Sequence, residues 1–246
     1  MTSGVSGITV FCAVWHGDAA RAELILAHRD NLRRQSVPVE VIYVFDGGDA
    51  APPGLEAHNI TSSSPLTIYQ AWNLALAAVK TPLVMNLNLD DRLAPDAVEK
   101  LAAHLEASGA ALAGGDWRIC YSQADTDAVT PCLPAGAVPF SLACPPAVES
   151  PRRLGSGTGE RLTFGPATLW RMRVHNQVPR YPWRLADGTL IKSVADGAFW
   201  SILSHLGLKL SRLPMVIGNY HFHPGTQAEY RVKESLADMM PRIMKV

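Results

Sequence analysis

The segment Leu83–Asp91, with the sequence LVMNLNLDD, constrains the fold of this chain more than any other stretch. A short apolar run that ends in polar turn residues is typical of a buried strand in a parallel sheet. Here the polar residues are Asn88, Asp90 and Asp91, at the predicted carboxyl end of the strand. In open α/β sheets ligands bind at that edge, so these side chains are candidate ligand contacts. The alternative is that both aspartates serve only the turn and the helix that follows.

A helix is predicted directly after this strand. Pro95 suits the first helical position, and Asp96 is favourable in the first turn. Gly109 is a good stop for the same helix. The chain therefore contains a strand–turn–helix unit with a polar turn.

The same alternation of strands and helices continues on both sides of this unit. Thr67 and Gln70 match a capping box at the start of one helix. Alternation of this kind predicts parallel strands joined by right-handed crossovers, which is an α/β fold. The expected strands are 8–15, 39–45, 83–91, 110–121, 208–213 and 216–222, with a further short strand near 57–61. The expected helices are 19–35, 67–80, 95–109, 196–206 and 227–246.

The charge balance excludes one class of function. The 246 residues contain 22 Lys and Arg and 22 Asp and Glu, so the formal net charge is zero and a general nucleic-acid binder is not expected. Residues 152–192 are locally basic, with eight Lys and Arg against two acidic residues. Such a segment indicates either a site for an anionic substrate or a solvated surface, and both remain open.

The region 124–160 interrupts the regular pattern with six prolines and four glycines. A long loop of this kind in a compact enzyme often covers the substrate, and disorder is the alternative. We predict one compact domain made of a first half, 1–123, and a second half, 124–246. The N-terminus lacks the basic start of a signal peptide, no apolar run is long enough to span a membrane, and the four cysteines show no CxxC spacing. We therefore expect a cytoplasmic protein without a zinc site or a transmembrane segment.

Three strand ends carry chemistry that suits a nucleotide. Trp15 can stack on a base, and Asp46 can accept a hydrogen bond from a base or a ribose. Asp90 can hold a divalent cation against a diphosphate, because Mg²⁺ and Mn²⁺ use one or two carboxylates and take other ligands from phosphate and water. If the strands are parallel, all three residues lie at one edge.

The first ~120 residues resemble the nucleotide-binding half of a family 2 glycosyltransferase of the GT-A fold. The segment VEVIYVFDGG resembles that family's strand ending in an Asp-Asp-Gly-Ser turn. The segment IYQAWNLALAAVKTPLVMNLNLDDRLAPDAVEKL resembles its run from the Ala-Arg-Asn helix through the DxD strand to the next helix. In the second half, VADGAFWSILSHLG resembles the helix with the catalytic base, and GNYHFHPGTQ resembles the C-terminal Tyr-x-x-His segment. The resemblance implies a mostly parallel, Rossmann-like sheet flanked by helices, with an acceptor-side extension.

The resemblance also implies a reaction and its site. The reaction is transfer of a sugar from a nucleotide-diphosphate sugar, with UDP favoured, to the hydroxyl of an unidentified acceptor, and the basic segment 152–192 leaves an anionic acceptor open. It is assisted by Mn²⁺ or Mg²⁺ and inverts the anomeric carbon. Asp196 is the expected general base. The expected metal ligands are Asp90, His223 and His221. The expected nucleotide-binding residues are Ala13, Val14, Trp15, Asp46, Asn73, Asn88 and Leu89.

Three departures from the family pattern leave other readings open. Asn88 replaces the first DxD acid, Trp72 replaces the Arg of Ala-Arg-Asn, and Ala195 replaces the Glu before the base. These changes are compatible with a non-catalytic nucleotide-sugar-binding protein of the same fold. A nucleotidyltransferase is the third reading, but the residues from Trp15 to Asp18 do not form the Gly-rich, basic loop that it would need.

Overall fold

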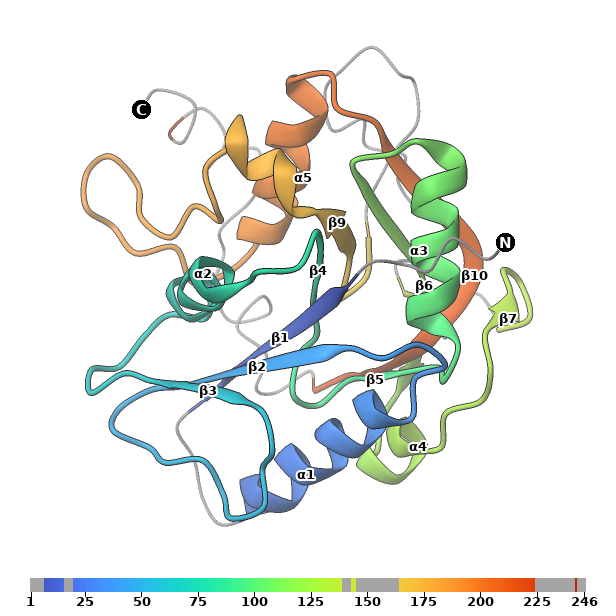
Figure 1. Ribbon diagram of the computed structural model, residues 1–246, viewed down its shortest axis with the longest axis horizontal. Helices are drawn as coiled ribbons and strands as arrows, with labels where there is room; N and C mark the ends of the chain where they lie inside the picture. The colour runs from blue at the N-terminus through green and yellow to red at the C-terminus, as the bar shows by residue number, and fades with distance from the viewer. Residues whose placement is uncertain (1–6, 16–19, 139–142, 145–163, 224–241, 243–246) are drawn as a thin grey trace.

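The computed structural model describes residues 7–15, 20–138, 143–144, 164–223 and 242. Within these residues, ten strands form one mixed sheet with helices packed on both of its faces (Figure 1). The strands run β3-β2-β1-β4-β9-β6-β10-β5, with β7 beside β10 and β8 beside β6. The strands are β1 Ile8–Val14, β2 Glu40–Phe45, β3 His58–Thr61, β4 Leu83–Asn86, β5 Arg92–Leu93, β6 Leu112–Cys120, β7 Leu133–Pro134, β8 Ala143–Cys144, β9 Leu169–Arg171 and β10 Leu210–His221. The helices are α1 Ala20–Arg33, α2 Ile68–Ala78, α3 Ala97–Ser108, α4 Gln123–Asp127, the 3₁₀ helix η2 Met172–Asn176 and α5 Ala195–His205.

The sheet directs the carboxyl ends of its main strands to one edge. Strand β1 is parallel to β2 and β4, and β2 is parallel to β3. Strand β9 is antiparallel to both β4 and β6, and β6 is parallel to β10. Strands β1, β2, β3, β4, β6 and β10 therefore all point the same way. This arrangement confirms the predicted α/β fold with a mostly parallel sheet.

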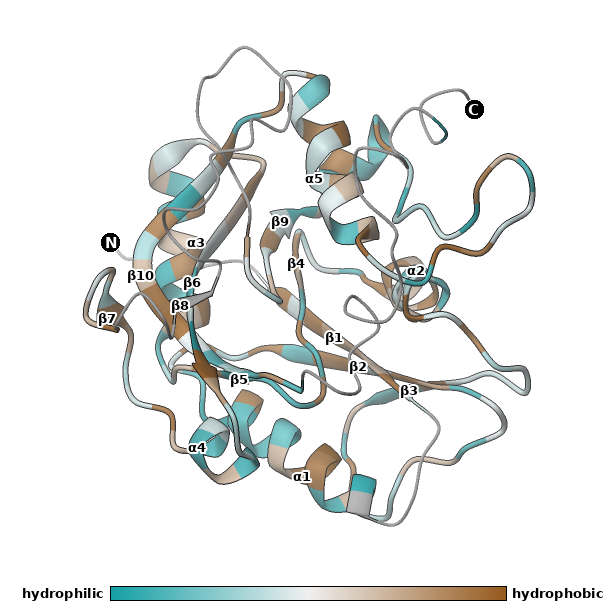
Figure 2. Cartoon of the chain, turned by 180° about the vertical axis from the view of Figure 1, so that it is seen from behind, coloured by the Kyte–Doolittle hydropathy of each residue, from teal (hydrophilic) through white to brown (hydrophobic). Residues whose placement is uncertain are grey.

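The two faces of the sheet are covered by different helices. Phe11 and Val84 pack with residues of α2 and α5, including Trp72 and Phe199, in one core. On the other face, Val10 and Met85 pack with residues of α3. Alternate residues of a strand point to opposite faces, which explains why neighbours in β1 enter different cores. Figure 2 shows hydrophobic residues along the central strands and a mixture of hydrophobic and hydrophilic residues on the helices.

The predicted helix signals are confirmed in one case and partly wrong in another. Thr67 and Gln70 form the complete capping box at the start of α2. Helix α3 starts later than predicted, because Asp96 is its N-cap and Pro95 therefore precedes the helix. The Asp96 carboxylate makes no capping bond to α3 and instead accepts from Cys132 N at 2.8 Å.

Other boundaries also differ from the sequence analysis. Strand β4 ends at Asn86, so the polar residues that follow belong to a turn. The two runs predicted at 208–213 and 216–222 form one long strand, β10, whose pairing with β6 contains register shifts. The predicted loop contains α4, β7 and β8 in its described parts. Most of the rest of that loop, and the predicted helix 227–246 apart from residue 242, lie outside the described residues.

One glycine permits a close approach next to the carboxyl edge. Gly218 of β10 pairs with Leu93 of β5. A Cβ on Gly218 would lie 2.4 Å from the carbonyl oxygen of Arg92 and 2.6 Å from the Trp117 ring. Any larger residue would therefore push β5 away.

Among the described residues, no helix is long and apolar enough to cross a membrane.

Candidate active site

The strand register brings the predicted site residues together at the carboxyl edge. Val14 of β1 lies opposite Phe45 of β2, and Phe11 lies opposite Asn86 of β4. Trp15, Asp46 and the turn 87–91 each follow one of these adjacent strands. The residues after β10 reach the same edge, because β10 runs in the same direction. The edge therefore combines residues from both halves of the chain.

Asp46 combines a fixed orientation with an unused acceptor. Its Oδ2 atom accepts a hydrogen bond from the backbone N–H of Leu66 at 2.9 Å. Its Oδ1 atom is buried and has no hydrogen-bond partner in the described part of the protein. A buried acceptor without a partner costs free energy unless a ligand or water satisfies it. Asp46 is therefore held in place and can accept one further hydrogen bond, from an N–H or O–H group of a ligand.

Trp15 lies beside Asp46 and is open to solvent. Trp15 is 48% exposed, which rules out a core role for this residue in the structure. The Arg21 guanidinium donates to the Trp15 carbonyl oxygen at 2.5 Å and pairs with Asp49. The backbone at Trp15 is therefore held by α1, while the ring is available for stacking.

Asp90 and His223 face each other across the edge. Their Oδ2 and Nε2 atoms lie 3.5 Å apart. The hydrogen bond and the negative charge of Asp90 raise the pKa of His223. The His221 ring lies beside the His223 ring, with 3.7 Å between the centroids. Burial, and then the nearby His223, lower the pKa of His221.

Asp91 has a different role from Asp90, although the two are adjacent. Asp91 is fully buried, and its Oδ1 atom accepts from the backbone N–H of His221 at 3.0 Å. Burial and the charge of Asp90 raise the pKa of Asp91 well above its usual value. A carboxyl group in this environment favours its neutral form. Asp91 therefore joins the turn to β10 rather than presenting a charge to a ligand.

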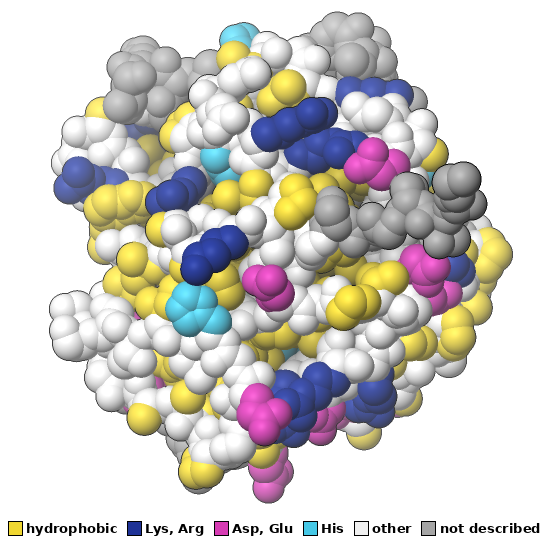
Figure 3. Space-filling model, in the orientation of Figure 1, with side chains coloured by type: hydrophobic (Ala, Val, Ile, Leu, Met, Phe, Trp, Pro, Cys, Tyr) yellow, Lys and Arg dark blue, Asp and Glu magenta, His cyan; other side chains and the backbone are white. Residues whose placement is uncertain are grey.

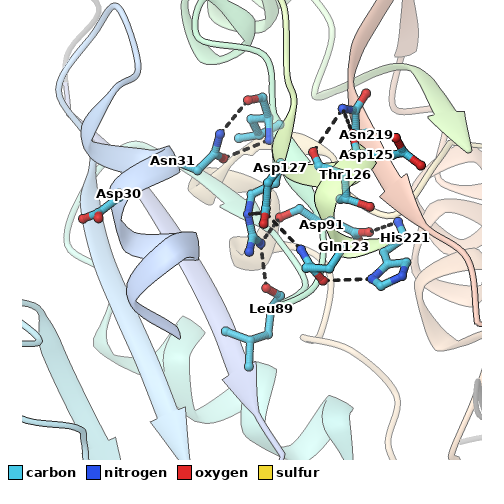
Figure 4. Close-up of polar contacts among 12 residues, drawn as sticks. Asp30, Asn31, Leu89, Asp91, Gln123, Asp125, Thr126, Asp127, Asn219 and His221 are labelled. Atoms are coloured by element: carbon cyan, nitrogen blue, oxygen red, sulfur yellow. Dashed lines mark hydrogen bonds and ion pairs between the residues drawn. The ribbon is translucent and has the colours of Figure 1, made fainter. Parts of the chain in front are cut away.

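A hydrogen-bonded network supports the turn from behind (Figure 4). The Arg92 guanidinium donates to the carbonyl oxygens of Leu89 and Asp91, both at 2.8 Å. Its Nε atom lies 2.7 Å from Oδ1 of Asp127 in α4. Gln123, also in α4, is hydrogen-bonded through Oε1 to Nδ1 of His221 at 2.9 Å. The small helix α4 thus contacts the supports of both Asp90 and His223.

Asp196 lies in the first turn of α5, not at its N-cap. The N-cap is Val194, which has a positive φ of 54°. Oδ1 of Asp196 accepts from the N–H of Gly197 at 2.8 Å. Burial, and then the charge of Asp196, raise the pKa of Tyr181. Asp196 is therefore close enough to Tyr181 for its charge to affect the phenol group, and the Tyr181 ring contacts Trp72 of α2.

A short chain of contacts connects Asp196 to the carboxyl edge. The N–H of Ala195 donates to the hydroxyl of Tyr69 in the first turn of α2 at 3.0 Å. The segment just before α2 is held by Asp46 through Leu66. The N-terminus of α5 is therefore hydrogen-bonded to the N-terminus of α2, and Asp46 holds the residues just before α2.

Four predicted nucleotide contacts have side chains that are largely occupied or buried. The Asn73 amide donates to Tyr181 O at 2.8 Å and accepts from Tyr181 N at 3.0 Å. Val14 and Leu89 are buried in one core cluster, and Ala13 packs against a different cluster, the one that contains Phe11 and Trp72. Any contact from these four to a nucleotide would use backbone atoms or remaining amide capacity. Asn88 differs, because its Oδ1 atom is buried without a hydrogen-bond partner among the described residues.

Trp72, at the position where the resemblance predicts Arg, lies in the core and not at the carboxyl edge. It is buried and contacts the rings of Phe11, Tyr69 and Tyr181, with centroids 6.0, 5.3 and 4.9 Å away. Trp72 therefore stabilises the core between α2 and the sheet instead of supplying a cation.

The donor set at the edge fits a hard cation that takes most of its ligands from phosphate and water. Among the described residues, no three His, Cys, Asp or Glu side chains are grouped to hold a metal ion by themselves. Asp90 and His223 supply one carboxylate and one imidazole that already face each other. Mg²⁺-type sites commonly have only one or two protein carboxylates and complete the shell with substrate oxygens.

Sequence reasoning missed Arg92, Gln123, Asp127 and Tyr69. Arg92 directly follows Asp90 and Asp91 and precedes the apolar Leu93–Ala94, and a charged run of this kind is typical of an exposed turn. Gln123 is bonded to His221, 98 residues away in sequence, and Tyr69 is bonded to Ala195, 126 residues away. Asp127 pairs with Arg92. No local pattern indicates such contacts.

Comparison with known proteins agrees with the fold and with the first half of the resemblance. Residues 21–134 match the sequence model of the family described as "Glycosyl transferase family 2". No curated protein matched the chain.

Solved structures of GT-A glycosyltransferases share the fold at low sequence identity. S. aureus TarS 1-349 in complex with UDP-GlcNAc has a TM-score of 0.64 at 12% identity, over 97% of this chain and 64% of that one. The full S. aureus TarS has a TM-score of 0.60 at 13% identity, over 89% of this chain and 37% of that one. The mannosyltransferase PcManGT from Pyrobaculum calidifontis, in complex with GDP-Man and Mn²⁺, has a TM-score of 0.57 at 13% identity, over 97% of this chain and 68% of that one. The chain thus spans less than two thirds of the length of the TarS chains.

Proposed function

We propose that this chain is a glycosyltransferase, on the premise that residues 21–134 match the family 2 glycosyltransferase model and that the fold is GT-A. The proposed reaction transfers a sugar from a nucleotide-diphosphate sugar to an acceptor hydroxyl. The observation that carries the proposal is the meeting of Trp15, Asp46 and the Asp90–His223 pair at one sheet edge. Residues 1–123 would bind the donor, and residues 124–246 would contribute the acceptor side. The cytoplasm remains the proposed compartment.

The donor nucleotide would bind between Trp15 and Asp46. The exposed Trp15 ring offers a stacking surface, and Oδ1 of Asp46 offers the unused acceptor for a base N–H or a ribose hydroxyl. We favour UDP, in line with the TarS structures that contain UDP and UDP-GlcNAc.

Asp90 and His223 would hold a divalent cation, Mn²⁺ or Mg²⁺, beside the diphosphate. His221 is the third predicted ligand, but its Nδ1 is hydrogen-bonded to Gln123 and its ring lies against the His223 ring, so in this proposal it orients His223. The bound cation would neutralise charge on the leaving diphosphate. The Mn²⁺ in the PcManGT complex supports this assignment. Because Asn88 is neutral, the site has one acid fewer than a DxD pair, and we expect weaker metal binding than at a two-acid site.

Asp196 would act as the general base. The carboxylate takes the proton of the acceptor hydroxyl as its oxygen forms a bond to the anomeric carbon. The bond from that carbon to the diphosphate oxygen breaks, and the leaving nucleotide keeps the electron pair. Attack from the face opposite the diphosphate inverts the anomeric centre. The attachment of Ala195 to Tyr69 supports a position for Asp196 close to the donor site.

An anionic acceptor would suit the hairpin that precedes α5. The hairpin is closed by a hydrogen bond from Ile191 N to Trp183 O at 2.9 Å. Arg180, Arg184 and Lys192 are exposed on it, and none has a hydrogen bond or ion pair to a described residue. Figure 3 shows that Lys and Arg side chains outnumber acidic ones over the half of this face that α5 occupies. These cations would recognise phosphate or carboxylate groups on the acceptor.

A nucleotide-sugar-binding protein without turnover is the second candidate. Asn88 at the first DxD position and the burial of Trp72 favour it. Both candidates predict binding of UDP with Mn²⁺, and only the first predicts release of nucleotide from a nucleotide sugar.

Calorimetry with UDP and Mn²⁺, followed by a nucleotide-release assay over a panel of labelled nucleotide sugars and acceptors, tests the proposal. Binding with turnover supports the transferase. Binding without release for any donor favours the second candidate. Absence of heat and of thermal shift at millimolar UDP with Mn²⁺ would contradict both.

A further inference from the structure

Arg92 occupies an unusual position for a charged residue. Its side chain is 2% exposed, in the two-residue strand β5 directly after the Asp90–Asp91 turn. Its Nη1 atom donates to the carbonyl of Leu89, which precedes Asp90, and to the carbonyl of Asp91, which follows it. One guanidinium nitrogen therefore bridges the backbone on both sides of Asp90.

Fold stability alone is a poor explanation for this residue. Removing a guanidinium from water is costly, and a hydrophobic side chain of similar volume often gives equal or greater stability. Within the described part of the chain, the carboxylate that pairs with Arg92 belongs to Asp127, whose side chain is 43% exposed. The Nη2 atom is buried and has no hydrogen-bond partner among the described residues. What a hydrophobic residue cannot replace is the pair of hydrogen bonds that hold the turn around Asp90.

Helix α4 links this clamp to the opposite side of the site. Asp127 holds Nε of Arg92, and Gln123 holds the ring of His221. Asn219 of β10 donates to the carbonyls of Asp125 and Thr126 at 3.2 and 3.0 Å, which fixes α4 against β10. The same short helix therefore supports the Asp90 turn through Arg92 and the His223 ring through His221.

We propose that Arg92, together with Asp127 and Gln123 of α4, positions Asp90 relative to His223 for cation binding. Arg92 is a positioning residue in this proposal and does not touch the ligand. The cation site itself rests on the proposed function. Outer hydrogen bonds that orient metal ligands typically change metal affinity by about 10–100-fold when they are removed.

The test compares Arg92→Lys and Arg92→Met with matched variants of Arg171. Arg171 makes a similar set of contacts, to Glu106 at 2.8 Å and to the carbonyls of Ala110 and Leu105 at 3.0 and 3.4 Å. It lies at the end of β9, which is antiparallel to β4 and so ends at the opposite sheet edge. The Arg171 variants therefore show the effect of losing a comparable set of arginine contacts at a position far from the proposed cation site.

Two measurements are made on each folded variant. Calorimetry gives UDP affinity with and without Mn²⁺, and amide hydrogen exchange without metal gives the protection of residues 87–93. We expect Arg92→Lys to reduce the Mn²⁺-dependent gain in UDP affinity by about 10–100-fold and to accelerate exchange in that segment. Lysine retains the charge but lacks the planar fork, so it cannot reproduce all three contacts. Arg171→Lys should leave both quantities unchanged.

The outcomes separate this proposal from the function on which it rests. Unchanged exchange at residues 87–93 in both Arg92 variants overturns the clamp, whatever UDP does. Faster exchange with an unchanged Mn²⁺ effect overturns the link from the clamp to the cation. If the wild type shows no Mn²⁺ effect on UDP binding, the cation site fails, and exchange alone then decides whether Arg92 holds the turn.

Discussion

The hydroxyl of Tyr69 accepts a hydrogen bond from the backbone N–H of Ala195 at 3.0 Å. Tyr69 is in the first turn of α2, and Ala195 is the first residue of α5. The bond joins two helix starts that are 126 residues apart in sequence. It also satisfies one of the N–H groups that a helix leaves unpaired at its N-terminus.

Replacing Tyr69 by Phe should test whether this bond places Asp196. The variant leaves a buried N–H unsatisfied, so we expect a loss of about 1–3 kcal/mol in the free energy of unfolding. Transfer activity should fall while UDP affinity is retained. Tyr181→Phe is the matched control, because the Tyr181 hydroxyl is buried without a hydrogen-bond partner among the described residues. Equal effects of the two variants on transfer would argue against a positioning role for Tyr69.

Asp46 variants should separate nucleotide binding from loop support. Asp46→Ala removes both the contact with Leu66 N and the unused acceptor, so UDP should bind more weakly by about 1–3 kcal/mol. Asp46→Asn keeps a carbonyl oxygen that can still accept from Leu66, so the loop should remain in place. Calorimetry with UDP and Mn²⁺ measures both variants. Wild-type affinity in Asp46→Ala would exclude this residue from the nucleotide site.

Adjacent aspartates should respond differently to the same substitution. Asp90→Asn should abolish the dependence of UDP binding on Mn²⁺, because it removes the proposed carboxylate ligand. Asp91→Asn should keep that dependence, because burial already favours a neutral Asp91 and its partner is a backbone N–H. Titration of each variant with Mn²⁺ in the presence of UDP provides the measurement. Retention of wild-type Mn²⁺ affinity in Asp90→Asn would show that Asp90 is not a ligand.

Asp196→Asn should remove transfer while leaving donor binding nearly intact. A positioned base contributes about 10²–10⁴-fold to such a reaction, so kcat should fall by that factor. The amide oxygen of Asn can still accept from Gly197 N, so α5 should keep its first turn. Asp187→Asn, in the exposed hairpin where Asp187 pairs with Arg242, is the control. Undiminished transfer in Asp196→Asn would move the base elsewhere.

His28 should make the protein less stable as the pH falls. It is fully buried against the Tyr43 hydroxyl at 2.8 Å, and burial, followed by the charge of Arg92, lowers its pKa to about 3. The contribution of neutral His28 to the free energy of unfolding is fully present above pH ~6.5, the pKa of histidine in the unfolded chain. Below that pH the unfolded chain binds a proton that the folded protein does not bind. Stability should then fall by up to about 1.4 kcal/mol per pH unit until the pH approaches 3.

Urea unfolding of the wild type and of His28→Gln between pH 7 and pH 5 measures this effect. The stability of the wild type relative to the variant should decrease steadily as the pH is lowered, since glutamine does not titrate. Parallel pH profiles for the two proteins would contradict the assignment.

The sequence by itself determined the elements of the first half and the edge at which the site lies. Apolar runs ending in Trp15, Asp46 and the 87–91 turn predicted three parallel strands, and Thr67 with Gln70 predicted the start of α2. These signals depend on periodicity and on residues within one turn of each other. Such information is local, and the structure reproduces it.

The tertiary structure decided the contacts that define the site. It inserted β9 antiparallel between β4 and β6, buried Arg92 behind the Asp90 turn, and brought His223 within 3.5 Å of Asp90. It also used Asn73 to hold Tyr181 and placed Trp72 in the core. These contacts form because the assembled sheet leaves apolar surfaces that other segments must cover. They also form because buried polar groups need hydrogen-bond partners. Those requirements involve residues tens of positions apart, so the local sequence around each residue does not contain them.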